Sequence, residues 1–189
     1  MNNNVFILLV GRSGSGKDCV AQGLHNLFGY RQVRSYTTRE KRFPEEDTHI
    51  FVKGSYYTAI PDDAVAITHF DGEFYWTNKQ QIEDNDIYVI DINGVERFFE
   101  NYKGNKKIIV CYIECEPGEC FQRMLDRGDT IDMVLARMRN DEFHFNKEKV
   151  KAFCNKYEVH SFYNGKSARL PAVVDAIDRL VCSQKIHSA

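Results

Sequence analysis

The sequence predicts an α/β fold of three layers, in which helices cover both faces of a mainly parallel central sheet. Strand-like segments alternate with helix-like segments along the chain, which is the order expected when helices connect parallel strands. The first strand-like segment is apolar at every position, as expected of a strand that is buried on both faces. The chain has 189 residues, 43% of them hydrophobic, so it fits one compact domain with a sizeable core.

The first strand is expected at Val5–Val10, directly before a glycine-rich stretch. Apolar residues then recur at helical spacing, at Val20, Leu24, Leu27 and Phe28. This spacing predicts a helix with one apolar face, so the glycine-rich stretch is a turn between a strand and a helix. Later strands are expected, with helical patterns between and after them, at residues 87–92, 107–113 and 157–163.

Two segments interrupt this alternation. Residues 36–86 are loop-rich and aromatic, and residues 127–146 are highly charged. Insertions of this kind commonly carry substrate sites and lids. We therefore expect a single domain over residues 1–189, with a core of residues 1–35, 87–126 and 147–189, a substrate-binding insert of residues 36–86 and a lid of residues 127–146.

Overall charge disfavours two classes of partner. The chain carries 25 basic and 27 acidic side chains, for a formal charge of −2, so nothing in its net charge favours binding to nucleic acid or to an anionic membrane. Met1–Asn4 are followed by only six apolar residues. This run is too short for a signal peptide or a membrane span, which predicts a cytoplasmic protein.

The six cysteines are expected to be reduced thiols, because the sequence shows no export signal. A zinc site could be imagined on Cys115 and Cys120, together with Cys111 or His144. We disfavour it, because structural zinc ligands usually form close pairs two to four residues apart.

The glycine-rich stretch Gly11–Asp18, with the sequence GRSGSGKD, fits the pattern G-x-x-x-x-G-K of a phosphate-binding loop and lacks only the final Ser or Thr. In such a loop the backbone N–H groups turn toward the β-phosphate of ATP, and the following helix N-terminus adds partial positive charge. We expect Lys17 to bridge the β- and γ-phosphates as a catalytic residue. The predicted ATP contacts are Gly11, Ser13, Gly14, Ser15, Gly16, Lys17 and Asp18.

Asp18 stands where the motif usually has a hydroxyl that binds Mg²⁺. A carboxylate is also an oxygen ligand for Mg²⁺, directly or through water. Asp91 ends a predicted strand, where an enzyme with such a loop keeps an acid for Mg²⁺ and its waters. We therefore expect ATP and Mg²⁺ as cofactors, with Asp18 and Asp91 as metal ligands. The alternative for Asp91 is a helix N-cap for the segment that begins near Gly94.

Beyond the loop, Arg34–Arg42 (RSYTTREKR) and Asp47–Val52 (DTHIFV) resemble guanylate kinase, and the resemblance spans nearly the whole chain. It implies a P-loop NTPase fold and phosphoryl transfer from ATP to a nucleoside monophosphate, with GMP the first candidate. The matching family segment, S-x-T-T-R-x-P-R, holds the acceptor phosphate, which implies this role for Ser35, Arg39 and Arg42. Two guanidinium groups three residues apart can fork around one dianion, which fits that role.

The same resemblance implies further acceptor contacts. Two phosphate-binding tyrosines of the family fall on His49 and on Tyr75, and Thr77 keeps a hydroxyl at a matching position. Trp76 replaces the glycine that the family has between them. The acceptor site is also expected to include Asp91.

Three arginines match the lid arginines of that family, which close over the transferring phosphoryl group: Arg123, Arg127 and Arg137. Neutralisation of charge by arginine is the expected catalytic device in phosphoryl transfer. Arg123 and Arg127 are four residues apart and so lie on one face of a helix, which is expected to end at Gly128. The alternative is a helix face that is simply solvated.

Two departures from the family concern recognition of the guanine base. The guanine-reading Glu of the family is replaced by Ala66, and its D-I-D-M-Q-G stretch is shortened to Asp91–Gly94 (DING). These changes remove base recognition and leave phosphate recognition in place. We therefore expect a small-molecule phosphate acceptor that is GMP or a related monophosphate, with relaxed or altered base selectivity. The active unit is expected to be a monomer or a homodimer.

Two other functions stay open. Asp18, His49–Ile50 and Asn93–Gly94 also resemble ribose 1,5-bisphosphate phosphokinase, which makes a sugar-phosphate kinase the alternative. Guanylate-kinase-like domains also occur as non-catalytic binding modules. Retention of Lys17 and Asp91, together with the three lid arginines, argues against that third interpretation.

Overall fold

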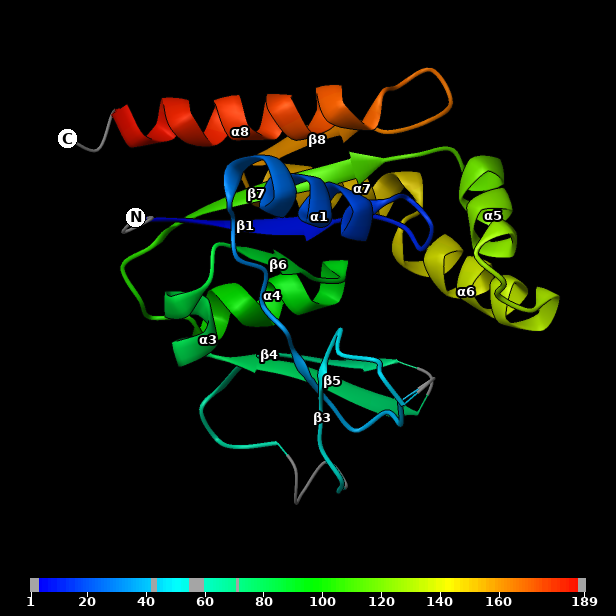
Figure 1. Cartoon of the computed structure of the whole chain (residues 1–189), viewed down its shortest axis with the longest axis horizontal. Coiled ribbons are helices and arrows are strands. Elements are labelled where there is room, and N and C mark those ends of the chain that lie inside the picture. The colour runs from blue at the N-terminus through cyan, green and yellow to red at the C-terminus, as the bar shows by residue number, and fades with distance from the viewer. Residues whose placement is uncertain (1–3, 42–43, 55–59, 71, 187–189) are drawn as a thin grey trace.

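The computed structural model describes residues 4–41, 44–54, 60–70 and 72–186 of the chain. Its centre is a sheet of four parallel strands in the order β6-β1-β7-β8, with helices around it (Figure 1). This arrangement confirms the predicted α/β fold with a parallel central sheet. The strands are β1 (Val5–Val10), β6 (Ile87–Val89), β7 (Lys107–Glu114) and β8 (Val159–Tyr163).

All six residues of β1 are buried, because helices cover both faces of the sheet. On one face, alternate side chains of β1 such as Ile7 pack against α1 (Lys17–Phe28) and α8 (Leu170–Ile186). On the other face, Phe6 and its neighbours pack against α4 (Ile92–Asn101) and α7 (Lys147–Lys156). The three layers follow from this alternation. No helix in the described part of the chain is long and apolar enough to span a membrane.

The apolar face predicted for the first helix covers the sheet only in part. Val20 and Leu24 are fully buried in α1, but Leu27 and Phe28 are 60% and 40% exposed. The helix ends directly after them at Gly29, which has a φ of 74°. The buried part of the apolar face of α1 therefore ends at Leu24.

A second sheet occupies much of the segment for which the sequence predicts loops, and corrects that prediction. Its strand order is β3-β2-β5-β4, and β4 and β5 form an antiparallel hairpin of mainly β-branched and aromatic residues. In Figure 1, α4 lies between β6 of the parallel sheet and β4 of this second sheet. The elements are β2 (Tyr36–Thr37), β3 (Ile50–Phe51), β4 (Ala64–Phe70), β5 (Glu73–Asn78) and the following helix α3 (Lys79–Asp84).

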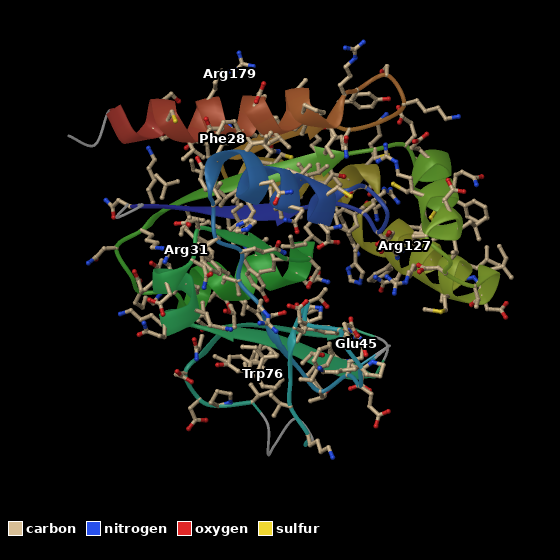
Figure 2. All side chains as sticks on the ribbon, in the orientation of Figure 1. Phe28, Arg31, Glu45, Trp76, Arg127 and Arg179 are labelled. Carbon is tan, nitrogen blue, oxygen red and sulfur yellow. The ribbon has the colours of Figure 1, made fainter. Side chains whose placement is uncertain are left out.

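Trp76 belongs to the core of this second sheet. It pairs with Tyr36 across β2 and β5, and the two rings stack with their centroids 5.5 Å apart. Only 2% of Trp76 is exposed, and Figure 2 shows it within the second sheet, away from the parallel one. The indole that replaces the glycine of the resembling family is therefore accommodated by packing inside the insert.

Two helices cover the region beyond the carboxyl ends of the parallel strands (Figure 1). They are α5 (Pro117–Asp126) and α6 (Ile131–His144). Gly128, with a φ of 94°, lies in the turn that separates them, as the sequence predicts. The α6 helix fills most of the segment predicted to be a lid.

Candidate active site

A cavity of about 280 Å³ lies where the loop after β1, the second sheet and α6 meet. Because β1 and β6 are parallel, the segments that follow them reach the same edge of the sheet, and this edge is where α/β proteins commonly bind ligands. The cavity brings together Gly11, Ser13, Lys17, Ser35, His49, Tyr75, Asp91 and Arg137. Its described lining does not include Gly14, Ser15, Gly16, Asp18, Arg39, Thr77, Arg123 or Arg127.

The loop between β1 and α1 requires its glycines. Gly14 and Gly16 have φ values of 74° and 90°, in the left-handed region that favours glycine. A Cβ atom on Gly14 would lie 2.5 Å from the carbonyl oxygen of Cys120. The side chain of Asn164, just beyond β8, donates a hydrogen bond to the carbonyl oxygen of Ser15 at 2.8 Å. Asn164 was missed in the sequence, where its place after a predicted strand was the available signal.

Lys17 lies along the inside of this loop. Its Nζ donates to the carbonyl oxygens of Gly11 at 2.7 Å and of Arg12 at 2.8 Å. Burial lowers the pKa of Lys17, and the acidic groups nearby, Asp18 first, oppose that effect. The ammonium group is therefore held at the cavity by two carbonyl oxygens.

The α6 helix brings a buried carboxylate to the same loop. Oδ2 of Asp141 accepts a hydrogen bond from the backbone N–H of Ser13 at 2.7 Å, and the Ser13 hydroxyl lies 3.4 Å from Oδ1. Burial raises the pKa of Asp141, and the bond from Ser13 and the charge of Lys17 oppose the rise. The sequence pattern does not single out Asp141. It follows Arg137 by four residues, so the two lie on one face of α6, and both line the cavity.

Arg12 fastens the end of α6 to the loop. Its Nη2 donates to the carbonyl oxygen of Phe145 at 2.6 Å, and its guanidinium carbon lies 5.9 Å from the centroid of the Phe145 ring. With the contact between Asp141 and Ser13, two adjacent loop residues thus hold one end of the helix.

The three arginines predicted for the lid lie on or beside α5 and α6. Nε of Arg123 donates to Glu119 at 3.1 Å, and its Nη1 lies 3.4 Å from the carbonyl oxygen of Ser15. Arg127, visible near the junction of the two helices in Figure 2, donates twice to Asp129, at 3.0 and 2.5 Å. These bonds raise the pKa of Arg127.

Arg137 differs from the other two arginines because it lines the cavity. Its Nε lies 3.8 Å from Oδ2 of Asp129, the carboxylate that also holds Arg127. Asp129 therefore joins two of the predicted lid arginines.

Three residues predicted to bind the acceptor meet at the opposite wall of the cavity. The Ser35 hydroxyl and Nδ1 of His49 are 2.9 Å apart, and the His49 ring meets the Tyr75 ring at an edge, with centroids 5.5 Å apart. Burial, and after it the charge of Arg39, lowers the pKa of His49. The imidazole is therefore neutral at pH 7 and can both donate and accept hydrogen bonds.

Arg39 pairs with an acid of the insert. Its Nη1 and Nη2 donate to the two carboxylate oxygens of Glu46, at 3.1 and 2.7 Å. Glu46 is only 3% exposed, and its hydrogen bonds raise the pKa of Arg39. Arg42, the second arginine of the predicted fork, lies outside the described residues. Thr77 is fully buried and its hydroxyl donates to Gln81 at 2.8 Å, so this hydroxyl is turned away from the cavity.

Asp91 caps α4, as the alternative interpretation of the sequence expected. Its Oδ1 accepts the backbone N–H groups of Asn93 at 2.8 Å and of Gly94 at 3.0 Å, and its Oδ2 accepts the Thr68 hydroxyl. The carboxylate nevertheless lines the cavity. Asp18 is exposed on the first turn of α1. Within the described ranges, no group of three or more His, Cys, Asp or Glu side chains could hold a metal ion.

The residues of β4 that face the cavity are Thr68 and His69. Ala66, at the position of the family's guanine-reading acid, is 1% exposed and belongs to the hydrophobic core. Two further polar groups, which the sequence did not assign to this site, close the cavity between α4 and α6: Nδ2 of Asn93 lies 3.1 Å from Nδ1 of His144.

Comparison with known proteins gives a family and a fold. A family model described as AAA domain matches residues 7–144, which is well over half of the chain. Among solved structures, the chain is similar to guanylate kinase from Anaplasma phagocytophilum, with a TM-score of 0.63 and 17% identity over 95% of this chain and 85% of that one. It is also similar to an uncharacterized protein from Eubacterium ventriosum, with a TM-score of 0.51 and 14% identity over 95% and 99% of the two chains. The TM-scores indicate a shared fold, and at these low identities the similarity shows the fold alone. No curated protein matches the chain by sequence.

Proposed function

The chain belongs to the AAA domain family, and we propose that it is an ATP-dependent kinase that transfers the γ-phosphoryl group to a phosphate of a small acceptor, with GMP the first candidate. One observation carries the proposal. A single cavity is lined by Lys17 of the phosphate-binding loop, by the acceptor-side residues Ser35 and His49, and by Arg137 of α6. In-line transfer needs donor and acceptor phosphates to face each other in one such space.

The loop suits the phosphates of ATP. The N–H of Ser13 already binds a negatively charged partner, the Asp141 carboxylate, and the N-terminus of α1 adds partial positive charge next to it. We assign Lys17 to the β- and γ-phosphates. It would exchange its bonds to the carbonyl oxygens of Gly11 and Arg12 for stronger bonds to charged oxygens.

Asp18 and Asp91 are the residues that we assign to Mg²⁺, which supplies charge neutralisation on the phosphates when it is bound. Mg²⁺ is commonly held by one or two protein carboxylates, water and phosphate oxygens. Asp91 lines the cavity, and Asp18 follows Lys17 on the exposed first turn of α1. The lack of a larger acidic cluster in the described part of the chain is compatible with that mode of binding. Asp91 retains its capping bonds to α4 in this role, since each carboxylate oxygen has two lone pairs.

We assign the insert, residues 36–86, to the acceptor. The hydroxyl of Ser35, the neutral imidazole of His49 and the hydroxyl of Tyr75 offer donors to the acceptor phosphate at one wall of the cavity. Arg39 and Arg42 would add positive charge. Base selectivity is expected to be weak, because Ala66 is in the core and no carboxylate of β4 lines the cavity to accept the N1–H and amino groups of guanine.

We assign residues 127–146 to a lid. Its Arg127 and Arg137, together with Arg123 at the end of α5, stabilise the charge that develops on the transferring phosphoryl group. A closed lid also excludes water and so limits hydrolysis of ATP. The transfer is direct, with no covalent intermediate on the protein, because the attacking acceptor phosphate is itself an ionised nucleophile at neutral pH.

A sugar-phosphate kinase acting on ribose 1,5-bisphosphate is the second candidate. The observation that favours it is the chemistry of the cavity wall opposite the loop, where Thr68, His69 and Asn93 offer a hydroxyl, an imidazole and an amide. Groups of this kind, which both donate and accept, suit sugar hydroxyls as well as they suit a base.

The test presents GMP, dGMP, AMP, UMP, dTMP and ribose 1,5-bisphosphate separately with MgATP and measures ADP formation. We expect several monophosphates to be used, GMP among them. Lys17→Ala should abolish the reaction, and Lys151→Ala, on the exposed face of α7, should not change it. Use of ribose 1,5-bisphosphate alone would establish the second candidate. If no acceptor stimulated ADP formation, the proposed kinase activity would be wrong and a binding module would be favoured.

A further inference from the structure

We propose that Asp141 occupies a phosphate position of the ATP-binding loop and has to leave it for ATP to bind, so that entry of the nucleotide is coupled to movement of α6. The proposal rests on the proposed ATP site at Gly11–Asp18. It assigns Asp141 as a positioning residue of the lid that controls access to the loop.

The contact itself is the first observation. A buried carboxylate lies 2.7 Å from the backbone N–H of Ser13 and 3.4 Å from its hydroxyl, in a loop whose N–H groups the sequence motif assigns to phosphate. A carboxylate has the charge and the acceptor oxygens of a phosphate, and both bind most strongly to N–H groups near a helix N-terminus. Asp141 and a phosphate oxygen therefore compete for the same donor.

The charges around Asp141 support this competition. The cationic groups that face it, Lys17 and Arg12, both belong to the loop. These are the groups that would face the phosphates of ATP. A carboxylate and a triphosphate that share one donor and one set of cations repel each other in a partly buried space. Binding of ATP therefore favours an arrangement in which Asp141 has moved away.

The packing of α6 allows such movement. The residues of this helix that are buried are Val134 and Asp141, and four of its large apolar side chains are 41–64% exposed: Ile131, Met133, Leu135 and Phe143. A helix with so little buried apolar surface moves at little free-energy cost. Its contacts with the loop include the Asp141 contact, the bond from Arg12 to Phe145 and the ion pair of Arg12 with Glu142 at 3.8 Å.

Movement of α6 would also change the sign of the charge that faces the phosphates. Arg137 and Asp141 are four residues apart on one face, and both line the cavity. A shift of α6 along its axis by about one helical turn, roughly 5.4 Å, would bring Arg137 to the level of the loop that Asp141 now contacts. The same helix thus opposes binding through Asp141 and supports transfer through Arg137.

The test compares wild type with Asp141→Asn and with Asp132→Asn, a matched control at the exposed start of the same helix. Binding of MgATP and of inorganic triphosphate is measured by calorimetry. Asn keeps the shape of the side chain and loses its charge. We expect Asp141→Asn to bind both ligands about tenfold more tightly or better, because a charge-assisted hydrogen bond no longer has to be broken. Asp132→Asn should bind like wild type.

Equal or weaker binding by Asp141→Asn would overturn the proposal. If none of the three proteins bound ATP or triphosphate, the proposed ATP site and the proposed function would be wrong as well. This outcome is distinguishable from equal or weaker binding by Asp141→Asn alone. If Asp141→Asn did not fold, amide exchange in wild type would decide. The proposal predicts faster exchange in residues 138–145 when MgATP binds, and slower or unchanged exchange would contradict it.

Discussion

At the scale of single residues, the arginines predicted to contact phosphate share one property. Each of those that the structure describes forms an ion pair within the chain, so a phosphate has to compete with an internal carboxylate for it. Such pairing fixes the orientation of the guanidinium group and offsets its charge in the absence of substrate. The pairs are Arg39 with Glu46, Arg123 with Glu119, and Arg127 and Arg137 with Asp129.

The pair of Arg39 and Glu46 predicts separate effects on stability and on acceptor binding. Arg39→Ala should lower the free energy of unfolding by about 3–5 kcal/mol, because it removes the guanidinium group that pairs with the buried Glu46 carboxylate. The double variant Arg39→Ala/Glu46→Ala should recover much of that loss, and this is checked by urea unfolding. Both variants should raise the KM for the acceptor, by the equivalent of about 1.5–3 kcal/mol for a lost bond to phosphate.

Two outcomes would contradict this account of Arg39. If the double variant were as unstable as Arg39→Ala, the buried Glu46 charge that has lost its guanidinium would not be the cause. If neither variant changed the KM for the acceptor, Arg39 would not contact it.

Asp141 predicts a dependence of stability on pH. Burial raises its pKa in the folded protein, so folding favours the protonated form. The Asp141 carboxyl group therefore favours the folded state most at low pH. Its contribution to the free energy of unfolding is lost as pH rises from the unfolded pKa, about 3.9, through the raised folded value. The free energy of unfolding of wild type, relative to Asp141→Asn, should fall over that range in urea titrations at successive pH values. A flat or rising difference would show that burial does not penalise this carboxylate.

At the scale of elements, local sequence signals predicted the strand, loop and helix that surround the phosphate site. β1 is apolar throughout, and the loop after it carries glycines and Lys17 in a fixed pattern. The second sheet was missed for a physical reason. β2 and β3 are two residues long, and their partners lie far along the chain, as in the pairing of Tyr36 with Trp76. Pairing between strands so far apart leaves no local pattern in the sequence.

The same reason explains which residues of the candidate site could be predicted from the sequence. Residues in recognisable motifs, such as Ser35 and His49, were predicted and do line the cavity. Asp141 and Glu46 could not be selected, because their importance depends on where α6 and the insert pack. Thr77 was selected from a motif, and its direction within β5, toward Gln81, is set by the sheet that the sequence did not reveal.

For α6, the helix proposed as the lid, we predict an effect on kcat and not on KM. Arg137→Ala should lower kcat by about 10²–10³-fold, the effect of removing one donor to developing charge, with little change in the KM for either substrate. The reason is that lid contacts form fully only as charge develops during transfer. Arg139→Ala, an exposed neighbour on α6, is the matched control and should leave kcat unchanged. Equal effects of the two substitutions would exclude a specific role for Arg137.

At the scale of the whole molecule, the fold places the proposed donor and acceptor sites in separate layers that share one edge. The parallel sheet supports the phosphate-binding loop, the second sheet supports Ser35, His49 and Tyr75, and α4 lies between the two sheets (Figure 1). The α6 helix closes the space from the third side. Under the proposed function, each substrate would meet its own part of the chain, and the reacting phosphates would meet in the cavity between the two parts.

The most direct test of this account follows the phosphorus atoms. Wild-type protein is mixed with MgATP and GMP, and in a second sample with MgATP and ribose 1,5-bisphosphate, and ³¹P NMR spectra are recorded over time. We predict that the signals of ADP grow together with those of a newly phosphorylated acceptor, the β-phosphate of GDP in the first sample, without release of inorganic phosphate. Unchanged ATP in both samples, or inorganic phosphate as the sole second product, would contradict direct transfer to an acceptor phosphate.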